Sequence, residues 1–193
     1  MDPQIERRFV SVMRSWLISL PYDLKILYEA SSDENLPRPI RESVVGAIIY
    51  VVSPQDSITS DRDDFASYVD DCIVLRQAIS QLHTAKDEDS EFFVSRFTEF
   101  FEPLTDEMNV CKSALGDLYG WLEQKIPALT SLEYKGKKVP MFLDDEEARE
   151  LLYEDGLGFA TEYPIDEEKL ADRFKKSSRV IEVLERRKAE EPK

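Results

Sequence analysis

The residues best suited to bind a ligand are four aspartates in the first half of the chain. Asp56 and Asp61 lie in a polar stretch, and Asp70-Asp71 stand as a pair in the helical pattern that follows. Clustered carboxylate oxygens are the ligands that hard divalent cations prefer. Their spacing differs from an EF-hand loop, which needs glycine at its sixth position and glutamate at its twelfth. The four aspartates are therefore candidate metal ligands of a metal-dependent hydrolase or a metal-binding domain.

The same aspartates also have a purely structural explanation. Ser53 can cap a helical turn that starts at Pro54, with Asp56 completing a capping box. Either Asp70 or Asp71 can face that turn and accept hydrogen bonds from its N–H groups, since a buried carboxylate must find partners. Both explanations predict that Asp56 lies close to Asp70 or Asp71.

The remaining reactive side chains form no complete catalytic set. His83, the only histidine, lies near the end of a helical pattern, where a capping or surface role is expected. Cys72 and Cys111 lie far apart in apolar helical patterns, which favours buried free thiols over a disulfide or a zinc site. The sequence has no glycine-rich phosphate loop and no Ser-His-acid arrangement. We expect no catalytic residue and no cofactor, apart from the divalent cation of the metal hypothesis.

Residues 38–83 contain an ordered set that resembles a known family. An apolar helical stretch leads to Tyr50, Ser53-Pro54-Gln55-Asp56, Ile58, Asp61 and Asp70-Asp71. This order resembles the YkvA-like domain, a small bacterial helical domain. The match departs from the family pattern at Thr59-Ser60, at Ser67 and by one residue inserted before Asp61. The resemblance implies a helical N-terminal domain in a bacterial protein and implies no biochemical activity.

Apolar residues recur at helical spacing along most of the chain, which predicts an all-α, multi-helix bundle. The clearest helices are expected over residues 2–20, 21–30, 39–52, 63–84, 144–154 and from 166 onwards. Pro21 is expected to begin a helix, and Gly156 to terminate one from the C-terminal position that glycine prefers. The helix at 39–52 is apolar nearly all round and is therefore expected at the centre of the core. Only residues 133–142, with Gly136 at the turn, favour a short β-hairpin.

The charged run at residues 86–91 predicts a solvated connector between two parts of the chain. Residues 1–85 would form the YkvA-like helical domain. Residues 86–193 would form a helical C-terminal region, either separate or packed on the first part as one unit. No apolar run approaches the roughly 20 residues needed to cross a bilayer. The first residues lack the pattern of a signal peptide, so we expect a cytoplasmic location.

The formal net charge of −15 is the largest global signal, and it is uneven. Residues 86–164 carry 19 acidic and 8 basic side chains. Such a field repels phosphate backbones and attracts basic proteins, so the expected partner is another, basic protein and not nucleic acid. The final helix is nearly neutral. It could dock on the acidic middle through Lys175, Lys176 and Arg179, or exchange with a second copy.

Two stretches are candidate partner-binding sites. Phe92 and Phe97 belong to a phenylalanine-rich helix that is most simply core, but would form a partner-binding face if it stayed exposed. The other stretch is the acidic run Asp144, Asp145, Glu146 and Glu147. The preferred function is a non-catalytic, helical protein-binding or regulatory module with an acidic surface. The alternatives are the metal-dependent hydrolase or metal-binding domain and an acidic mimic of nucleic acid. The oligomeric state is not predicted.

Overall fold

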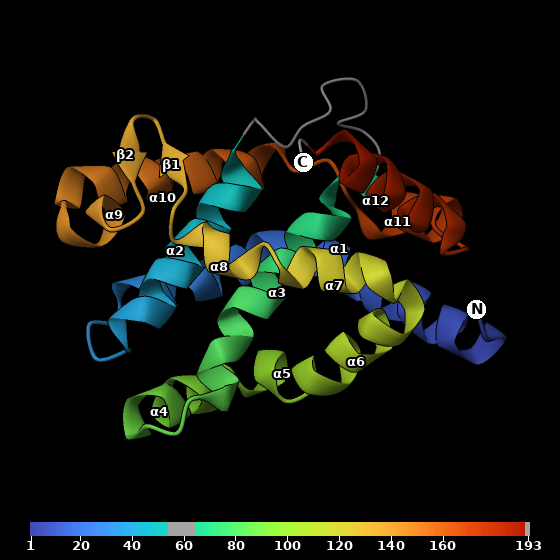
Figure 1. Cartoon of the computed structure of the whole chain (residues 1–193), viewed down its shortest axis with the longest axis horizontal. Coiled ribbons are helices and arrows are strands. Elements are labelled where there is room, and N and C mark those ends of the chain that lie inside the picture. The colour runs from blue at the N-terminus through green and yellow to red at the C-terminus, as the bar shows by residue number, and fades with distance from the viewer. Residues whose placement is uncertain (54–64, 192–193) are drawn as a thin grey trace.

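The computed structural model describes residues 1–53 and 65–191, and it is 79% helical (Figure 1). The helices are α1 Pro3–Ser32, α2 Arg38–Val52, η2 Phe65–Tyr68, α3 Val69–Thr84, α4 Glu88–Arg96, α5 Thr98–Phe101, α6 Leu104–Leu115, α7 Asp117–Glu123, α8 Ile126–Leu129, α9 Met141–Asp144, α10 Glu146–Glu162, α11 Glu167–Arg173 and α12 Ser178–Glu190. Strands β1 Glu133–Tyr134 and β2 Lys137–Lys138 form an antiparallel hairpin. The predicted all-α fold with one short hairpin is confirmed.

The hairpin turns at Lys135 and Gly136. Both residues have positive φ, 48° and 76°. Two consecutive positive φ values are typical of the two-residue turn whose twist matches that of paired strands. Gly136 was the residue that marked this turn in the sequence.

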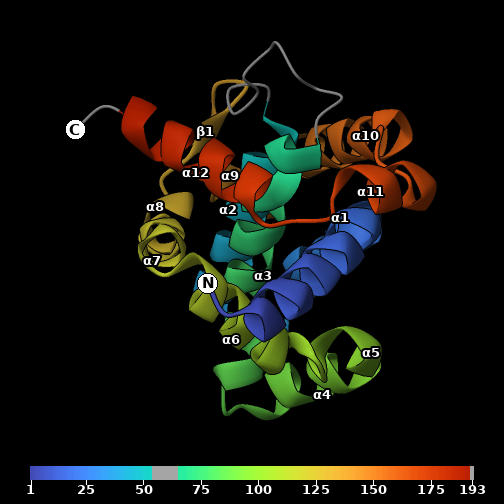
Figure 2. The same ribbon diagram turned by 90° about the vertical axis from the view of Figure 1, so that its right-hand side faces the viewer.

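Helices α1, α2 and α3 form the centre of the molecule, where α2 packs against both α3 and α1 (Figures 1 and 2). The middle of α2 is buried on every side from Ser43 to Ile49, as its apolar sequence predicted. Gly46 allows α8 to approach closely. A Cβ atom at Gly46 would lie 2.4 Å from the carbonyl oxygen of Leu129.

A single hydrophobic cluster takes residues from both of the predicted parts, from Phe9 in α1 to Leu184 in α12. Helix α6 packs against α1, and α4 packs against α3, so elements beyond residue 86 cover elements before it. The domain boundary at residues 86–91 stays a prediction. The candidate functional residues described below lie on helices that contribute to this hydrophobic cluster.

The first helix is longer than the sequence predicted. Pro21 begins no new helix and lies inside the 30-residue α1. Proline has no N–H, so the carbonyl of Leu17, one turn earlier, loses its usual donor. The hydroxyl of Tyr163 donates to that carbonyl at 2.7 Å. A side chain from the far end of the sequence thus supplies the hydrogen bond that proline cannot.

Two expected helix boundaries in the C-terminal region were also wrong. Gly156 does not end a helix, because α10 continues to Glu162. Gly156 instead faces Tyr28, whose hydroxyl would lie 2.1 Å from a Cβ at this position. The expected final helix is divided into two helices, α11 and α12. Arg14 donates to the carbonyl of Phe174, directly after the end of α11, at 2.8 Å. A cation is favourable at the C-terminus of a helix.

Both cysteines are buried and free, as predicted. Burial raises the pKa of the Cys72 and Cys111 thiols, which disfavours the reactive thiolate form. Among the described residues, no helix is long and apolar enough to cross a membrane.

Candidate functional site

The paired aspartates open α3 and are almost fully buried. Asp70 is 1% exposed and Asp71 is 5% exposed. They follow directly after η2, which brings the chain into α3. Asp56 and Asp61 lie outside the described residues, so their predicted approach to Asp70 or Asp71 stays a prediction.

Asp70 is the anchor of a buried polar group that we call the Asp70 site. The hydroxyl of Tyr50 donates to Asp70 Oδ2 at 2.9 Å. The Arg187 guanidinium forms an ion pair with Asp70 Oδ1, and its Nη2 donates to the Ser67 carbonyl at 2.9 Å. Within residues 1–53 and 65–191, the Asp70 site comprises Asp70, Tyr50, the Ser67 carbonyl and Arg187. It joins the start of α3 to α2 and to the last helix of the chain.

The metal hypothesis depends on residues beyond those in the Asp70 site. Within residues 1–53 and 65–191 there is no group of three His, Cys, Asp or Glu side chains that could hold a metal ion. A cation at Asp70 would have to displace the guanidinium of Arg187. A metal site made by Asp56, Asp61, Asp70 and Asp71 stays a prediction.

A second buried ion pair joins α1 to α3. Arg76 Nη2 donates to Asp23 Oδ2 at 2.6 Å and to Ser19 Oγ at 2.9 Å. Its guanidinium lies between the rings of Trp16 and Phe100, 4.5 and 4.8 Å from their centroids. Burial raises the pKa of Asp23 to about 6, although Arg76 opposes the shift. The buried pair therefore joins α1 to α3 within the core.

The single histidine lies at the surface. His83 is exposed in the last turn of α3, and its ring stacks on Phe101 with centroids 6.2 Å apart. This position agrees with the expected capping or surface role.

The phenylalanine-rich segment divides into a core part and an exposed residue. Phe93, Phe100 and Phe101 are buried. Phe97 is half-buried and packs on Phe93, with ring centroids 4.9 Å apart. Phe92 is 65% exposed on α4. Of the two predicted partner-binding phenylalanines, only Phe92 presents most of its side chain to solvent.

The predicted acidic run also divides. Asp144 accepts two hydrogen bonds from the Arg38 guanidinium, at 2.8 and 2.7 Å, which lower the pKa of its carboxyl. Asp145 caps α10 by accepting from the Ala148 N–H at 3.0 Å. These two carboxylates hold α9 and α10 in place. Glu146 and Glu147 remain exposed at the start of α10.

Helix α10 lies at the edge of the molecule, where it packs on α1, α2 and α9, and it carries an exposed surface that we call the α10 face (Figure 2). The α10 face consists of Glu146, Glu147, Glu150, Tyr153, Glu154 and Leu157. Tyr153 is 48% exposed and Leu157 is 46% exposed. None of its four glutamates forms an ion pair with any residue that the structure describes. The α10 face thus combines two exposed large side chains, Tyr153 and Leu157, with four acidic side chains, three of which precede them along the helix.

Sequence reasoning missed several of these residues. The signal for the α10 face was present, because residues 146, 150, 154 and 157 recur at helical spacing. Extending the acidic run by two turns would have found Glu150 and Glu154. Arg187 follows Val180, Val183 and Leu184 on the same side of the last helix, a spacing that predicts a buried arginine.

Comparisons with known proteins give no match. No family model, no curated protein and no solved structure matches the chain. The resemblance to the YkvA-like domain therefore rests on the sequence motif and stays a prediction. Two residues of that motif, Tyr50 and Asp70, are the pair joined by a hydrogen bond in the Asp70 site.

Proposed function

We propose that this chain is a non-catalytic, helical protein-binding module that recognises a basic protein through its acidic surface. The observation that carries the proposal is the α10 face, where four exposed glutamates share one side of the helix with the exposed Tyr153 and Leu157. Exposed aromatic and large aliphatic side chains within a polar rim are typical of protein interaction sites.

The chemistry of the partner follows from charge. The charge of the four α10 glutamates is not neutralised by an ion pair with any residue that the structure describes. The whole chain also carries a formal net charge of −15. Complementary charges raise the association rate and disfavour acidic partners and nucleic acid. The exposed Tyr153 and Leu157 require an apolar group on the partner as well. The fitting partner is therefore a basic segment that also presents leucine-like or aromatic side chains.

The α10 face is a better site than the exposed Phe92. Around Phe92 the apolar surface is one side chain, and Arg96 of the same helix lies over the neighbouring rings of Phe93 and Phe97. On α10, two large side chains lie one turn apart and their acidic neighbours have no competing cation. Phe92 serves as the comparison site in the experiment.

A synthetic amphipathic peptide of lysine and leucine, labelled with a fluorophore, provides the probe. Replacing Glu146, Glu147, Glu150 and Glu154 by Gln should weaken its binding about tenfold at low salt, because the charges nearest the bound lysines are removed. Raising the ionic strength to about 0.3 M should reduce most of this difference, because salt screens exposed charges. The measurement is fluorescence anisotropy at several salt concentrations.

The matched control removes four acidic charges elsewhere, as Glu88→Gln, Asp89→Asn, Glu99→Gln and Glu102→Gln. It has the same net charge as the α10 variant, and we expect binding to weaken only about twofold through the general field. Equal losses in the two variants would show that net charge alone attracts the peptide. A larger loss of peptide affinity in the control variant, or in Phe92→Ala, would show that the peptide binds near α4 and not on α10. Absence of binding by the wild type would refute the proposal.

A further inference from the structure

We infer that the Asp70 site is a receptor for an arginine-bearing amphipathic helix, and that α12 occupies it as an intramolecular ligand that such a helix can replace. The inference concerns a second binding surface, formed by η2, the start of α3 and α7. It does not depend on the α10 face. Its ligand is a helix with apolar residues in three positions and an arginine one turn beyond them.

The first observation is how the guanidinium is held. Asp70 is 1% exposed, and the Arg187 side chain is 10% exposed. Asp70 Oδ1 forms an ion pair with Arg187 Nη1, the carbonyl of Ser67 accepts a hydrogen bond from Arg187 Nη2, and the Tyr50 hydroxyl donates to the other oxygen of Asp70. Arginine presents several donors in a planar fork, so two acceptors at this spacing select arginine over lysine.

The second observation is the spacing along α12. Val180, Val183 and Leu184 are its buried apolar residues, and Arg187 is the buried cation. These positions are i, i+3, i+4 and i+7, which is the spacing by which a helix binds in a groove as a peptide ligand. The rest of α12 faces solvent or the edge of the groove.

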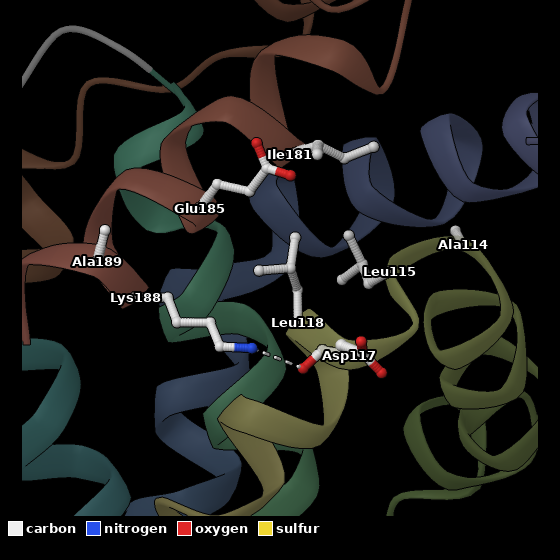
Figure 3. A pocket seen from close by; sticks show the side chains of 8 residues that line it. All are labelled: Ala114, Leu115, Asp117, Leu118, Ile181, Glu185, Lys188 and Ala189. Atoms are coloured by element: carbon white, nitrogen blue, oxygen red, sulfur yellow. Dashed lines mark hydrogen bonds between the residues drawn. The ribbon is translucent and has the colours of Figure 1, made fainter.

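The third observation is an open surface groove beside α12. An open cavity of about 540 Å³ lies between α12 and the junction of α6 with α7 (Figure 3). Leu115, Leu118 and Ile181 line it, with Glu185 and Lys188 at its edge (Figure 3). A helix with a larger residue at the position of Ile181 would fill this space better than α12 does.

The end of α12 is also held by contacts to α7 and to the segment before α8. Glu191 accepts from the Trp121 indole at 2.7 Å and pairs with Lys125, and its own side chain is 44% exposed. Lys188 reaches the Asp117 carbonyl only at 3.5 Å (Figure 3). Exposed ion pairs and long hydrogen bonds contribute little to stability. Ser177 at the start of α12 donates to Glu6 at 2.9 Å, and Arg187 is the buried ion-pair partner in its last turns, so a competing arginine at Asp70 would replace the contact that fixes this end of the helix.

Peptide competition on the full-length chain tests the inference. The probes are a labelled peptide with the sequence of residues 177–191 and the same peptide with Gln in place of Arg187. In the Arg187→Gln chain, where the internal helix has lost its anchor, the arginine peptide should bind about tenfold tighter than the glutamine peptide. In the double variant Asp70→Asn with Arg187→Gln, this preference should disappear. The four α10 Glu→Gln changes should leave it unaltered, which separates this test from that of the α10 face.

A folded Arg187→Gln chain that binds neither peptide, or binds both equally, would overturn the inference. Hydrogen exchange of the wild type provides a second test that needs no variant. Amides of α12 should exchange by local opening at least about 100-fold faster than those of α3, because a replaceable helix must open without global unfolding. Equal protection of the two helices would show that α12 is a fixed part of the fold.

Discussion

Replacing Asp23 by Ala is expected to lower the free energy of unfolding by about 3–5 kcal/mol, because it leaves the Arg76 guanidinium buried without its counter-ion. Arg76 and Asp23 have side chains that are 5% and 2% exposed. The two rings around Arg76 attract its charge but cannot replace a carboxylate. Urea denaturation followed by circular dichroism measures the change.

The chain offers a matched control in the ion pair of Arg8 and Asp106. Its N–O distance is also 2.6 Å, but its side chains are 53% and 73% exposed. Asp106→Ala should cost only about 0–1 kcal/mol, because water screens an exposed pair. The double variant Asp23→Leu with Arg76→Met should recover most of the stability lost in Asp23→Ala, since a buried pair can be replaced by apolar residues at little cost. Similar losses for Asp23→Ala and Asp106→Ala would show that burial of the pair has no energetic consequence.

Gly46→Ala is expected to destabilise the protein by about 1–3 kcal/mol, because the added methyl group overpacks the contact between α2 and α8. The new Cβ would meet the Leu129 carbonyl oxygen at 2.4 Å, and this atom belongs to the backbone and cannot turn away. The cost of this steric overlap should exceed the gain in helix propensity, which favours alanine over glycine by about 1 kcal/mol. Thermal and urea denaturation measure the difference.

Gly158→Ala is the control for Gly46→Ala. Gly158 also lies inside a helix, and nothing lies within 4 Å of a Cβ built there. This substitution should stabilise the protein by about 0.5–1 kcal/mol through helix propensity alone. If both substitutions stabilised the protein, the close approach of α8 to α2 would be wrong.

Much of the fold could be predicted from the sequence, because periodic apolar residues determine which segments become helices. The buried α2 and the hairpin at Gly136 were found in this way. The errors arose where distant residues decide the local structure. Pro21 lies within α1, where Tyr163 donates to the Leu17 carbonyl that proline leaves without a donor. Gly156 lies within α10, where its missing side chain makes room for Tyr28. No local pattern around either residue contains that information.

The functional residues were predictable to a smaller extent. The pair at Asp70 stood out because two adjacent acids begin an apolar helix, but their cationic partner lies more than a hundred residues away in α12. In the acidic run, charge alone could not separate the carboxylates that pair or cap from those that stay exposed. Asp144 meets Arg38 only through the tertiary fold. The sequence therefore predicted an acidic surface, and the structure is needed to place its exposed part on α10.

The proposed function is tested most directly by mapping where the basic peptide binds. Backbone amide chemical shifts of the full-length chain, recorded during titration with the lysine and leucine peptide, report the contact residue by residue. We expect the largest changes between Glu146 and Gly158, with Tyr153 and Leu157 among them, since these two exposed side chains exclude water when they are covered. Changes centred on residues 88–96 around Phe92, or small changes spread over all acidic residues, would contradict the proposal that the α10 face recognises a basic partner.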